Sequence, residues 1–312
     1  MGYLNEDVQL VALLRANKGV AWHRITTVVE NAGTAQGLVT GEVEAPNDFA
    51  RSLVRAVGEE HLEDARREVS SWREREDMEV WSILDEAYPS SLRTIFDRPP
   101  YIFCRGAWDD EQDGRGVAVV GTRQASDEGL AQARRMAYEL VRRSVTVLSG
   151  LAVGIDGEAH RAALDARGRT VAVLGSGLDH IYPAEHEGLA EEIVAAGGAL
   201  LSPFVPSQRP ARTYTFAIRN AVMSGLSRGT IVIEAGPTSG ARMQARLALQ
   251  HGRPVFLPRP LVETHAWARS YAEKGRYGAR ALAVEDIGDV LRALETGEPD
   301  LPDLQLKLAL EH

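Results

Sequence analysis

Ser149-Gly150-Leu151-Ala152-Val153-Gly154-Ile155-Asp156 follows the β-branched run Val145-Thr146-Val147 and leads into a helical segment that carries Ala159-His160. A glycine turn between a strand and a helix points backbone N–H groups at an anion. Two further turns of this kind, Gly121-Thr122-Arg123 and Gly175-Ser176-Gly177, each follow an apolar run. Because the carboxyl ends of parallel strands meet at one edge of a sheet, we expect the three turns to form one phosphate-binding edge.

Apolar runs alternate with helical stretches from residue 117 onward. Continuous apolar strands separated by helices are typical of a parallel sheet that is covered on both faces. The sequence therefore predicts an α/β fold with a doubly wound, mostly parallel, Rossmann-like sheet. We expect strands near 117–121, 145–149, 170–174, 199–202, 230–234 and 254–257, and helices near 126–143, 157–166, 185–196, 220–226, 239–251 and 285–294.

The first 75 residues have a different pattern, in which short turns separate helices. Asn47 is the expected N-cap of one of these helices. The stretch 13–38 resembles a helix-hairpin-helix or SAM-like module, which either binds DNA or serves as a scaffold or interaction surface. We expect a small helical domain over 1–75, a Rossmann-like DNA-binding domain over 76–300, and a tail over 301–312 whose last residues resemble part of a histidine tag.

The charge of the chain is unevenly distributed. The 312 residues carry a net charge of −9, yet residues 200–282 hold 12 Arg and Lys residues against three Glu residues. A local positive field matters more for binding nucleic-acid phosphates than the total charge does. The segment therefore favours a nucleic-acid partner, with a solvated basic face as the alternative.

Several classes of protein are disfavoured by what the sequence lacks. Cys104 is the only cysteine, which excludes an internal disulfide and fits a reducing compartment. There is no P-loop, Gly175-Ser176-Gly177 lacks the third glycine of a dinucleotide fold, and the eight histidines show no metal-ligand spacing. We expect no cofactor, no metal and no catalytic activity. Without a signal peptide or a long apolar run, we expect a cytoplasmic protein that does not associate with membranes.

Individual side chains beside the turns suggest how an anion is held. Arg123 follows a strand end, Arg219 precedes Asn220 at a short helix, and Ser239-Gly240 opens another helix. A buried arginine can instead pair with a carboxylate such as Glu234. His160 follows Asp156 by one helical turn, and we prefer a hydrogen bond that braces the loop over a catalytic pair.

These motifs, together with Tyr182-Pro183 and Phe216-Ala217-Ile218-Arg219-Asn220, resemble the DprA/Smf family of DNA-processing proteins over roughly residues 80–292. The resemblance implies a homodimer that binds single-stranded DNA through its backbone and delivers it to a RecA-type recombinase, in DNA uptake, recombination or defence against mobile DNA. The DNA-binding residues that it implies are Gly121, Thr122, Arg123, Ser149, Gly150, Gly154, Asp156, His160, Gly175, Gly177, Arg219, Asn220, Ser239, Gly240 and Arg242.

The chain departs from the family pattern around the expected pocket. The departures are Pro203, Ala217, Ala221, Gln244 and Arg259, which replace the residues usual at those positions, and Arg242 adds a charge. A competing interpretation is a nucleotide-binding sensor or a nucleotide-processing protein of the same Rossmann-like superfamily. Gly236-Pro237-Thr238-Ser239-Gly240 lacks the glutamate that the resembling phosphoribohydrolases place soon after it, which disfavours hydrolysis.

Overall fold

The computed structural model describes residues 2–210 and 214–296 and divides into two compact units. The first comprises Met1–Tyr88 and Asp97–Phe103, and the second comprises Pro89–Phe96 and the chain from Cys104 onward. The first unit thus extends beyond the predicted boundary at residue 75, and the predicted tail over 301–312 lies outside the described residues.

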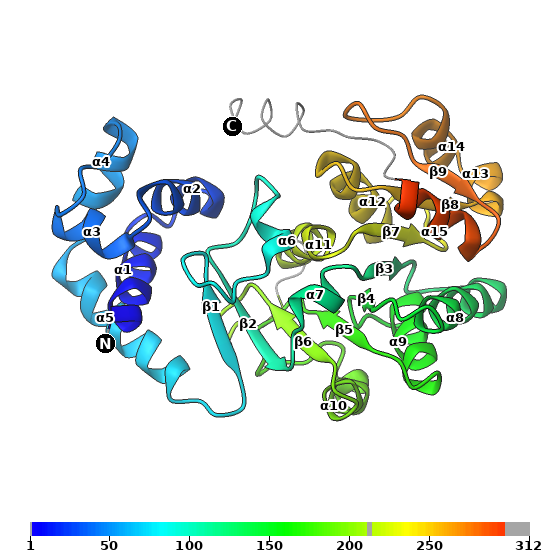
Figure 1. Ribbon diagram of the computed structural model, residues 1–312, viewed down its shortest axis with the longest axis horizontal. Coiled ribbons are helices and arrows are strands. Elements are labelled where there is room, and N and C mark those ends of the chain that lie inside the picture. Colours follow the sequence, from blue (N-terminus) through cyan, green and yellow to red (C-terminus); the bar gives the residue numbers. More distant parts are fainter. Residues whose placement is uncertain (1, 211–213, 297–312) are drawn as a thin grey trace. The chain divides into compact units, whose positions relative to one another are not determined.

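The first unit is mainly helical (Figure 1). Its elements are α1 (Gly2–Ala16), α2 (Trp22–Ala32), α3 (Ala35–Thr40), α4 (Asp48–Arg55), α5 (Glu59–Arg73), β1 (Glu79–Ser82) and the first half of β2 (Tyr101–Gly106). The Asn47 side chain accepts a hydrogen bond from the Ala50 N–H at 2.9 Å, which confirms it as the N-cap of α4. At the start of α3, the Glu6 carboxylate accepts the N–H groups of Ala35 and Gln36 at 2.7 and 3.0 Å, so α1 and α3 are joined by a charge-assisted cap.

The second unit is an α/β layer structure in which neighbouring strands from β3 to β9 pair with one another in parallel. Its strands lie in the order β6-β5-β4-β3-β7-β8-β9. They are β3 (Val117–Val120), β4 (Val147–Ser149), β5 (Thr170–Val173), β6 (Ala199–Ser202), β7 (Gly229–Val232), β8 (Val255–Pro258) and β9 (Leu282–Val284). The helices are α6 (Ser90–Arg93), α7 (Asp110–Asp113), α8 (Asp127–Val141), α9 (Ile155–Asp165), α10 (Glu187–Ala195), α11 (Tyr214–Leu226), α12 (Gly240–Gln250), α13 (Arg259–Thr264), α14 (Ala266–Glu273) and α15 (Ile287–Thr296).

The order of the strands places a topological switch between β3 and β7. The chain moves outward from β3 through β4, β5 and β6, then returns to the other side of β3 and continues through β7, β8 and β9. Connections on the two sides of such a point leave in opposite directions, which opens a crevice beyond the strand ends. The sheet therefore places its ligand crevice at the ends of β3 and β7.

Successive side chains of β3 point to opposite faces of the sheet. Val117 and Val119 belong to a buried apolar cluster with residues of α8, α9 and α15. Figure 1 shows α8 and α9, drawn in green, side by side. Val120 points to the opposite face and lines a cavity together with residues of α11 and α12. The fold is the doubly wound α/β arrangement that the sequence predicts.

All six predicted strands are present within a residue or two of their expected positions, but some elements differ. Helix α11 begins at Tyr214 rather than near 220, so Phe216 and Arg219 lie within a helix instead of in a loop before it. The short helices α13 and α14 and the strand β9 are not predicted. Leu282–Val284 has one buried residue in three, so its sequence carries too weak a pattern to identify a strand that is fixed by pairing with β8.

Candidate functional site

The crevice at the topological switch contains a cavity of about 590 Å³. It is bounded by the end of β3 and its following loop, by the start of α9, by one side of α11, and by the loop that leads into α12. Eight of the candidate residues line it: Gly121, Thr122, Arg123, Asp156, Arg219, Asn220, Ser239 and Gly240. Residues far apart in the sequence thus surround one space at the expected edge of the sheet.

The carboxylate of Asp156 lines the cavity. Asp156, in the first turn of α9, accepts the N–H of Gly150 at 3.2 Å and that of Gly121 at 3.4 Å. Burial raises the pKa of Asp156, and the nearby Arg219 charge and the backbone donors oppose that shift. The expectation that these two turns offer their N–H groups to an external anion is therefore wrong for Gly121 and Gly150, because Asp156 occupies both donors.

Arg219 is buried beside this carboxylate, with an exposed fraction of 6%. Its Nη1 donates to the carbonyl oxygens of Gly150 at 2.6 Å and Val173 at 3.0 Å, and its Nε donates to Asn220 Oδ1 at 3.0 Å. Burial lowers the pKa of Arg219, and the charge of Asp156 counteracts this. Arg219 therefore links the ends of β4 and β5 to α11.

Glu234, the alternative partner of a buried arginine, has another role in the structure. Its Oε2 accepts both the N–H and the hydroxyl of Ser126 at 3.0 Å, at the start of α8. Asn220 in turn donates from Nδ2 to the Gly240 carbonyl at 3.2 Å and so connects α11 with α12. The walls of the cavity are thus held together by hydrogen bonds between its own candidate residues.

Two glycines make room for this arrangement. A Cβ on Gly150 would lie 1.6 Å from Arg219 Nη1, and one on Gly175 would lie 2.7 Å from the ring of Phe216. Neither distance is possible for a real side chain. These glycines therefore serve the packing of Arg219 and Phe216 rather than direct contact with a ligand.

The rim of the cavity carries a cation beside two aromatic rings. The guanidinium carbon of Arg123 lies 5.2 Å from the ring centre of Phe216 and 5.9 Å from that of Tyr182. The two ring centres are 5.9 Å apart, and Tyr182 is 44% exposed. Within the described residues, Arg123 forms no ion pair with a carboxylate. The rim thus combines an accessible positive charge with flat apolar surfaces.

The first turn of α12 forms another wall. Ser239 is its N-cap and accepts the N–H of Ala241 at 3.2 Å, while Thr238, Ser239 and Gly240 line the cavity. The start of an eleven-residue helix carries a partial positive charge. This end of α12 therefore offers an anion a favourable electrostatic field. The turns at Gly121 and Gly150 do not, because their N–H groups already donate to Asp156.

A comparison with known families decides the affiliation of the chain. The family model for DNA recombination-mediator protein A matches residues 79–295. The chain belongs to this family. The resemblance to DprA/Smf proteins is thereby confirmed.

Individual members of the family are similar over most of this chain. Protein Smf of Escherichia coli is 38% identical over 233 residues, which cover 74% of this chain and 61% of the relative. Protein Smf of Synechocystis is 36% identical over 232 residues, which cover 73% and 57%. The chain thus spans about three fifths of the length of these relatives.

Solved structures of the same family have a similar fold. DNA processing protein A of Streptococcus pneumoniae has a TM-score of 0.62 and 27% identity, with 93% of this chain and 95% of the other chain covered. DNA processing protein A of Helicobacter pylori, described for its unique single-stranded DNA binding mode, has a TM-score of 0.60 and 26% identity, with 70% and 96% covered.

Several candidate residues from the family motifs do not line the cavity. The Ser149 hydroxyl donates to the Val119 carbonyl at 2.6 Å and joins β4 to β3. Gly154 is the N-cap of α9 with a φ of 80°, and the Gly177 N–H donates to the Gln208 carbonyl at 2.8 Å. These residues shape the turns, whereas Arg242 lines a neighbouring cavity.

His160 is fully buried in α9 and does brace the structure, but through a different partner. Its Nδ1 lies 2.7 Å from the Thr170 hydroxyl, which donates to the Val147 carbonyl at 2.8 Å. No hydrogen bond joins it to Asp156 within the described residues. Burial, together with nearby positive charges, lowers the pKa of His160 to about 3, so the ring is neutral near pH 7.

The departures from the family pattern have distinct surroundings. Ala217 lines the cavity, Pro203 and Ala221 are buried, and Arg259 pairs with Glu285. Gln244 also lines the cavity, yet it is 1% exposed and neither amide atom has a hydrogen-bond partner among the described residues. Phe216 lines the cavity as well, although it is not one of the DNA-binding residues that the sequence implies. Phe216 stands in a quoted motif, but only the helix places its ring at the rim.

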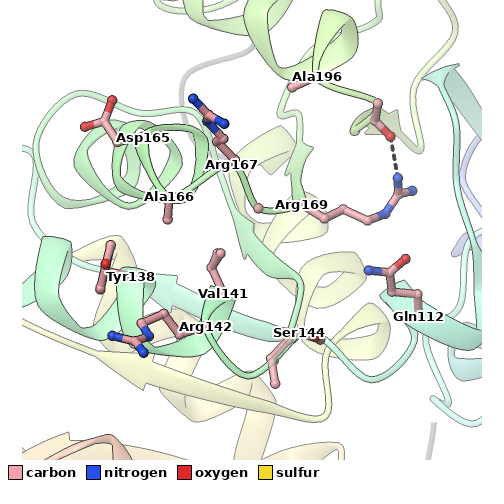
Figure 2. A pocket seen from close by; sticks show the side chains of 13 residues that line it. Gln112, Tyr138, Val141, Arg142, Ser144, Asp165, Ala166, Arg167, Arg169 and Ala196 are labelled. Atoms are coloured by element: carbon pink, nitrogen blue, oxygen red, sulfur yellow. Dashed lines mark hydrogen bonds between the residues drawn. The ribbon is translucent and has the colours of Figure 1, made fainter.

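A second cavity of about 580 Å³ lies at the opposite edge of the sheet (Figure 2). It is lined by the C-terminal ends of α8 and α9 and by Arg142, Arg167 and Arg169. Arg169 donates to the Gly197 carbonyl and pairs with Asp113. Helix C-termini carry partial negative charge, which these arginines offset. The opposite edge is therefore a poorer anion site than the cavity at the switch.

Within residues 2–210 and 214–296, no group of His, Cys, Asp and Glu side chains is arranged to hold a metal ion. In the same residues, no helix has both the length and the apolar character needed to cross a membrane.

Proposed function

We propose that this protein binds single-stranded DNA in the switch cavity and acts as a recombination mediator. The observation that carries the proposal is the rim, where the guanidinium of Arg123 lies beside the rings of Tyr182 and Phe216 and forms no ion pair with a carboxylate among the described residues. Proteins that hold single strands combine cationic contacts to the backbone with aromatic surfaces on which bases stack. Duplex DNA hides its base faces and cannot use such a rim.

Each part of the cavity has a separate task in this proposal. Arg123 and the start of α12, with Thr238 and Ser239, hold successive phosphates. Tyr182 and Phe216 hold a base. Arg219 and Asp156 hold the cavity walls in place and do not contact the strand, because their polar groups are already hydrogen-bonded to the backbone of Gly150.

The remaining parts of the proposal rest on the family. The description of the matching model as a recombination mediator supports delivery of the strand to a RecA-type recombinase. We propose further that the protein acts as a homodimer in the cytoplasm, in natural transformation or in defence against mobile DNA, and that it is not an enzyme.

A nucleotide-binding sensor is the second candidate. A cavity of about 590 Å³ is within the range of pockets that enclose small ligands. A sensor would hold one nucleotide and would gain nothing from a longer strand, whereas a strand-binding protein gains contacts with each added phosphate.

The deciding experiment is a fluorescence-anisotropy titration of labelled oligo-dT at two salt concentrations, with unlabelled duplex DNA and mononucleotides as competitors. Salt-sensitive binding that neither competitor displaces efficiently is the expected result. Efficient competition by a mononucleotide would replace the proposal with the sensor. No binding of either ligand would reject both.

A further inference from the structure

A smaller cavity adjoins the switch cavity on the outer side of α12. It has a volume of about 260 Å³, and Thr238, Ser239 and Met243 line both cavities. The first turn of α12 is therefore a wall common to the two spaces.

Three arginines line this smaller cavity. Arg242 and Arg246 come from α12, and the exposed Arg276 comes from the segment after α14. Within the described residues, none of the three forms an ion pair with a carboxylate. Arg242 and Arg246 are four residues apart on one helix face, where like charges destabilise the helix. The arrangement concentrates positive charge that the described chain does not neutralise.

Tyr271 lines the same cavity, and two further aromatic rings contact its arginines. The guanidinium carbon of Arg276 lies 5.7 Å from the ring centre of Tyr271 and 5.4 Å from that of Tyr277. Arg246 Nη1 lies 3.5 Å from the Tyr277 hydroxyl, and Arg242 lies over the ring of Trp267 at 5.9 Å. These contacts orient the three guanidinium groups without neutralising them.

We propose that the small cavity is the continuation of the strand path, in which Arg242, Arg246 and Arg276 hold the phosphates of nucleotides beyond those in the switch cavity. This inference rests on the proposed function, since it assigns a second part of the same DNA site. The ligand of the small cavity is then a polyanion with repeating phosphates that is long enough to reach from one cavity to the next. A free mononucleotide in the switch cavity does not use it.

The test compares oligo-dT strands of increasing length in the full chain and in the double variant Arg246→Ala/Arg276→Ala. The shortest strand that binds fills only the switch cavity, so both proteins should bind it equally. With longer strands, the affinity of the unaltered protein should rise, whereas that of the double variant should not. The slope of log K against log salt should fall by about 1.4, at about 0.7 for each lost phosphate contact.

Arg142→Ala is the matched control, because it also removes an exposed arginine but lies at the opposite edge of the sheet (Figure 2). It should leave both the length dependence and the salt slope unchanged. Equal thermal unfolding temperatures of all variants would show that the folds are intact. A second double variant, Arg246→Lys/Arg276→Lys, retains the charges and should recover most of the gain with length.

Failure of this inference is distinguishable from failure of the proposed function. If the unaltered protein binds longer strands more tightly and the double alanine variant does so equally, the small cavity is not on the strand path, although the protein still binds DNA. If the unaltered protein binds no oligo-dT, the proposed function fails, and the continuation fails with it.

Discussion

Asp156 and Arg219 hold opposite sides of the same residue, Gly150. The Asp156 carboxylate accepts the Gly150 N–H at 3.2 Å, and Arg219 Nη1 donates to the Gly150 carbonyl at 2.6 Å. Both side chains are buried, at 5% and 6% exposed. The glycine turn after β4 is thus fixed by a carboxylate and a guanidinium of the chain itself.

Removing either charge alone should destabilise the fold. We expect Arg219→Met or Asp156→Leu to lower the free energy of unfolding by about 3–5 kcal/mol, because each leaves a buried charge without its counterpart. The double variant should cost less than the sum of the two. Urea unfolding of the four proteins measures this coupling, and strictly additive losses would contradict a coupled pair.

Arg123→Ala should weaken binding of oligo-dT and lower the slope of log K against log salt by about 0.7, because one phosphate contact is lost. The fold should be unaffected, since Arg123 has no ion pair within the described residues. Anisotropy titrations over a series of salt concentrations give the slope. An unchanged slope would remove Arg123 from the phosphate path.

Phe216→Ala should weaken binding without changing the salt slope. Loss of a stacked base costs about 1–3 kcal/mol and releases no counterion. Tyr138→Ala is a suitable control, because Tyr138 is a 43% exposed aromatic residue at the opposite edge of the sheet. Equal losses in the two variants would show that the effect is not specific to the rim.

His160 should make the fold sensitive to acid. Its pKa falls from 6.5 to about 3 on burial, so the unfolded chain takes up a proton at a pH where the folded protein does not. The stabilising contribution is complete above about pH 6.5 and is lost as the pH falls toward 3, by up to about 1.4 kcal/mol per pH unit. The difference in urea unfolding between the unaltered protein and His160→Asn, measured from pH 7 to about pH 4, isolates this effect. A difference that does not vary with pH would contradict the burial of a neutral ring.

Gln244→Met should stabilise the protein by about 1 kcal/mol or more. The buried amide of Gln244 has no hydrogen-bond partner among the described residues, and an unsatisfied buried polar group costs about 1–3 kcal/mol. Methionine has a similar shape without that cost. Thermal and urea unfolding measure the change, and a destabilised variant would show that the amide is bonded in solution.

The sequence by itself determined the sheet and the edge that holds the candidate site. Short apolar runs such as Val117–Val120, bounded by turns, favour buried strands, and glycine turns at their ends place Gly121 and Gly150 at one edge of the parallel sheet. The amphipathic helices and the cap at Asn47 follow from equally local rules. These features are encoded within a few neighbouring residues, so periodicity and turn chemistry reveal them.

Only the tertiary structure decided which groups face the cavity. Asp156 occupies the N–H groups that looked open in the sequence, Arg219 is buried and not at the rim, and Phe216 reaches the rim because α11 begins at Tyr214. Each of these outcomes depends on contacts between residues that are distant in the chain. A local sequence pattern states that a turn can bind an anion, but the packing of other elements determines whether the protein supplies that anion itself.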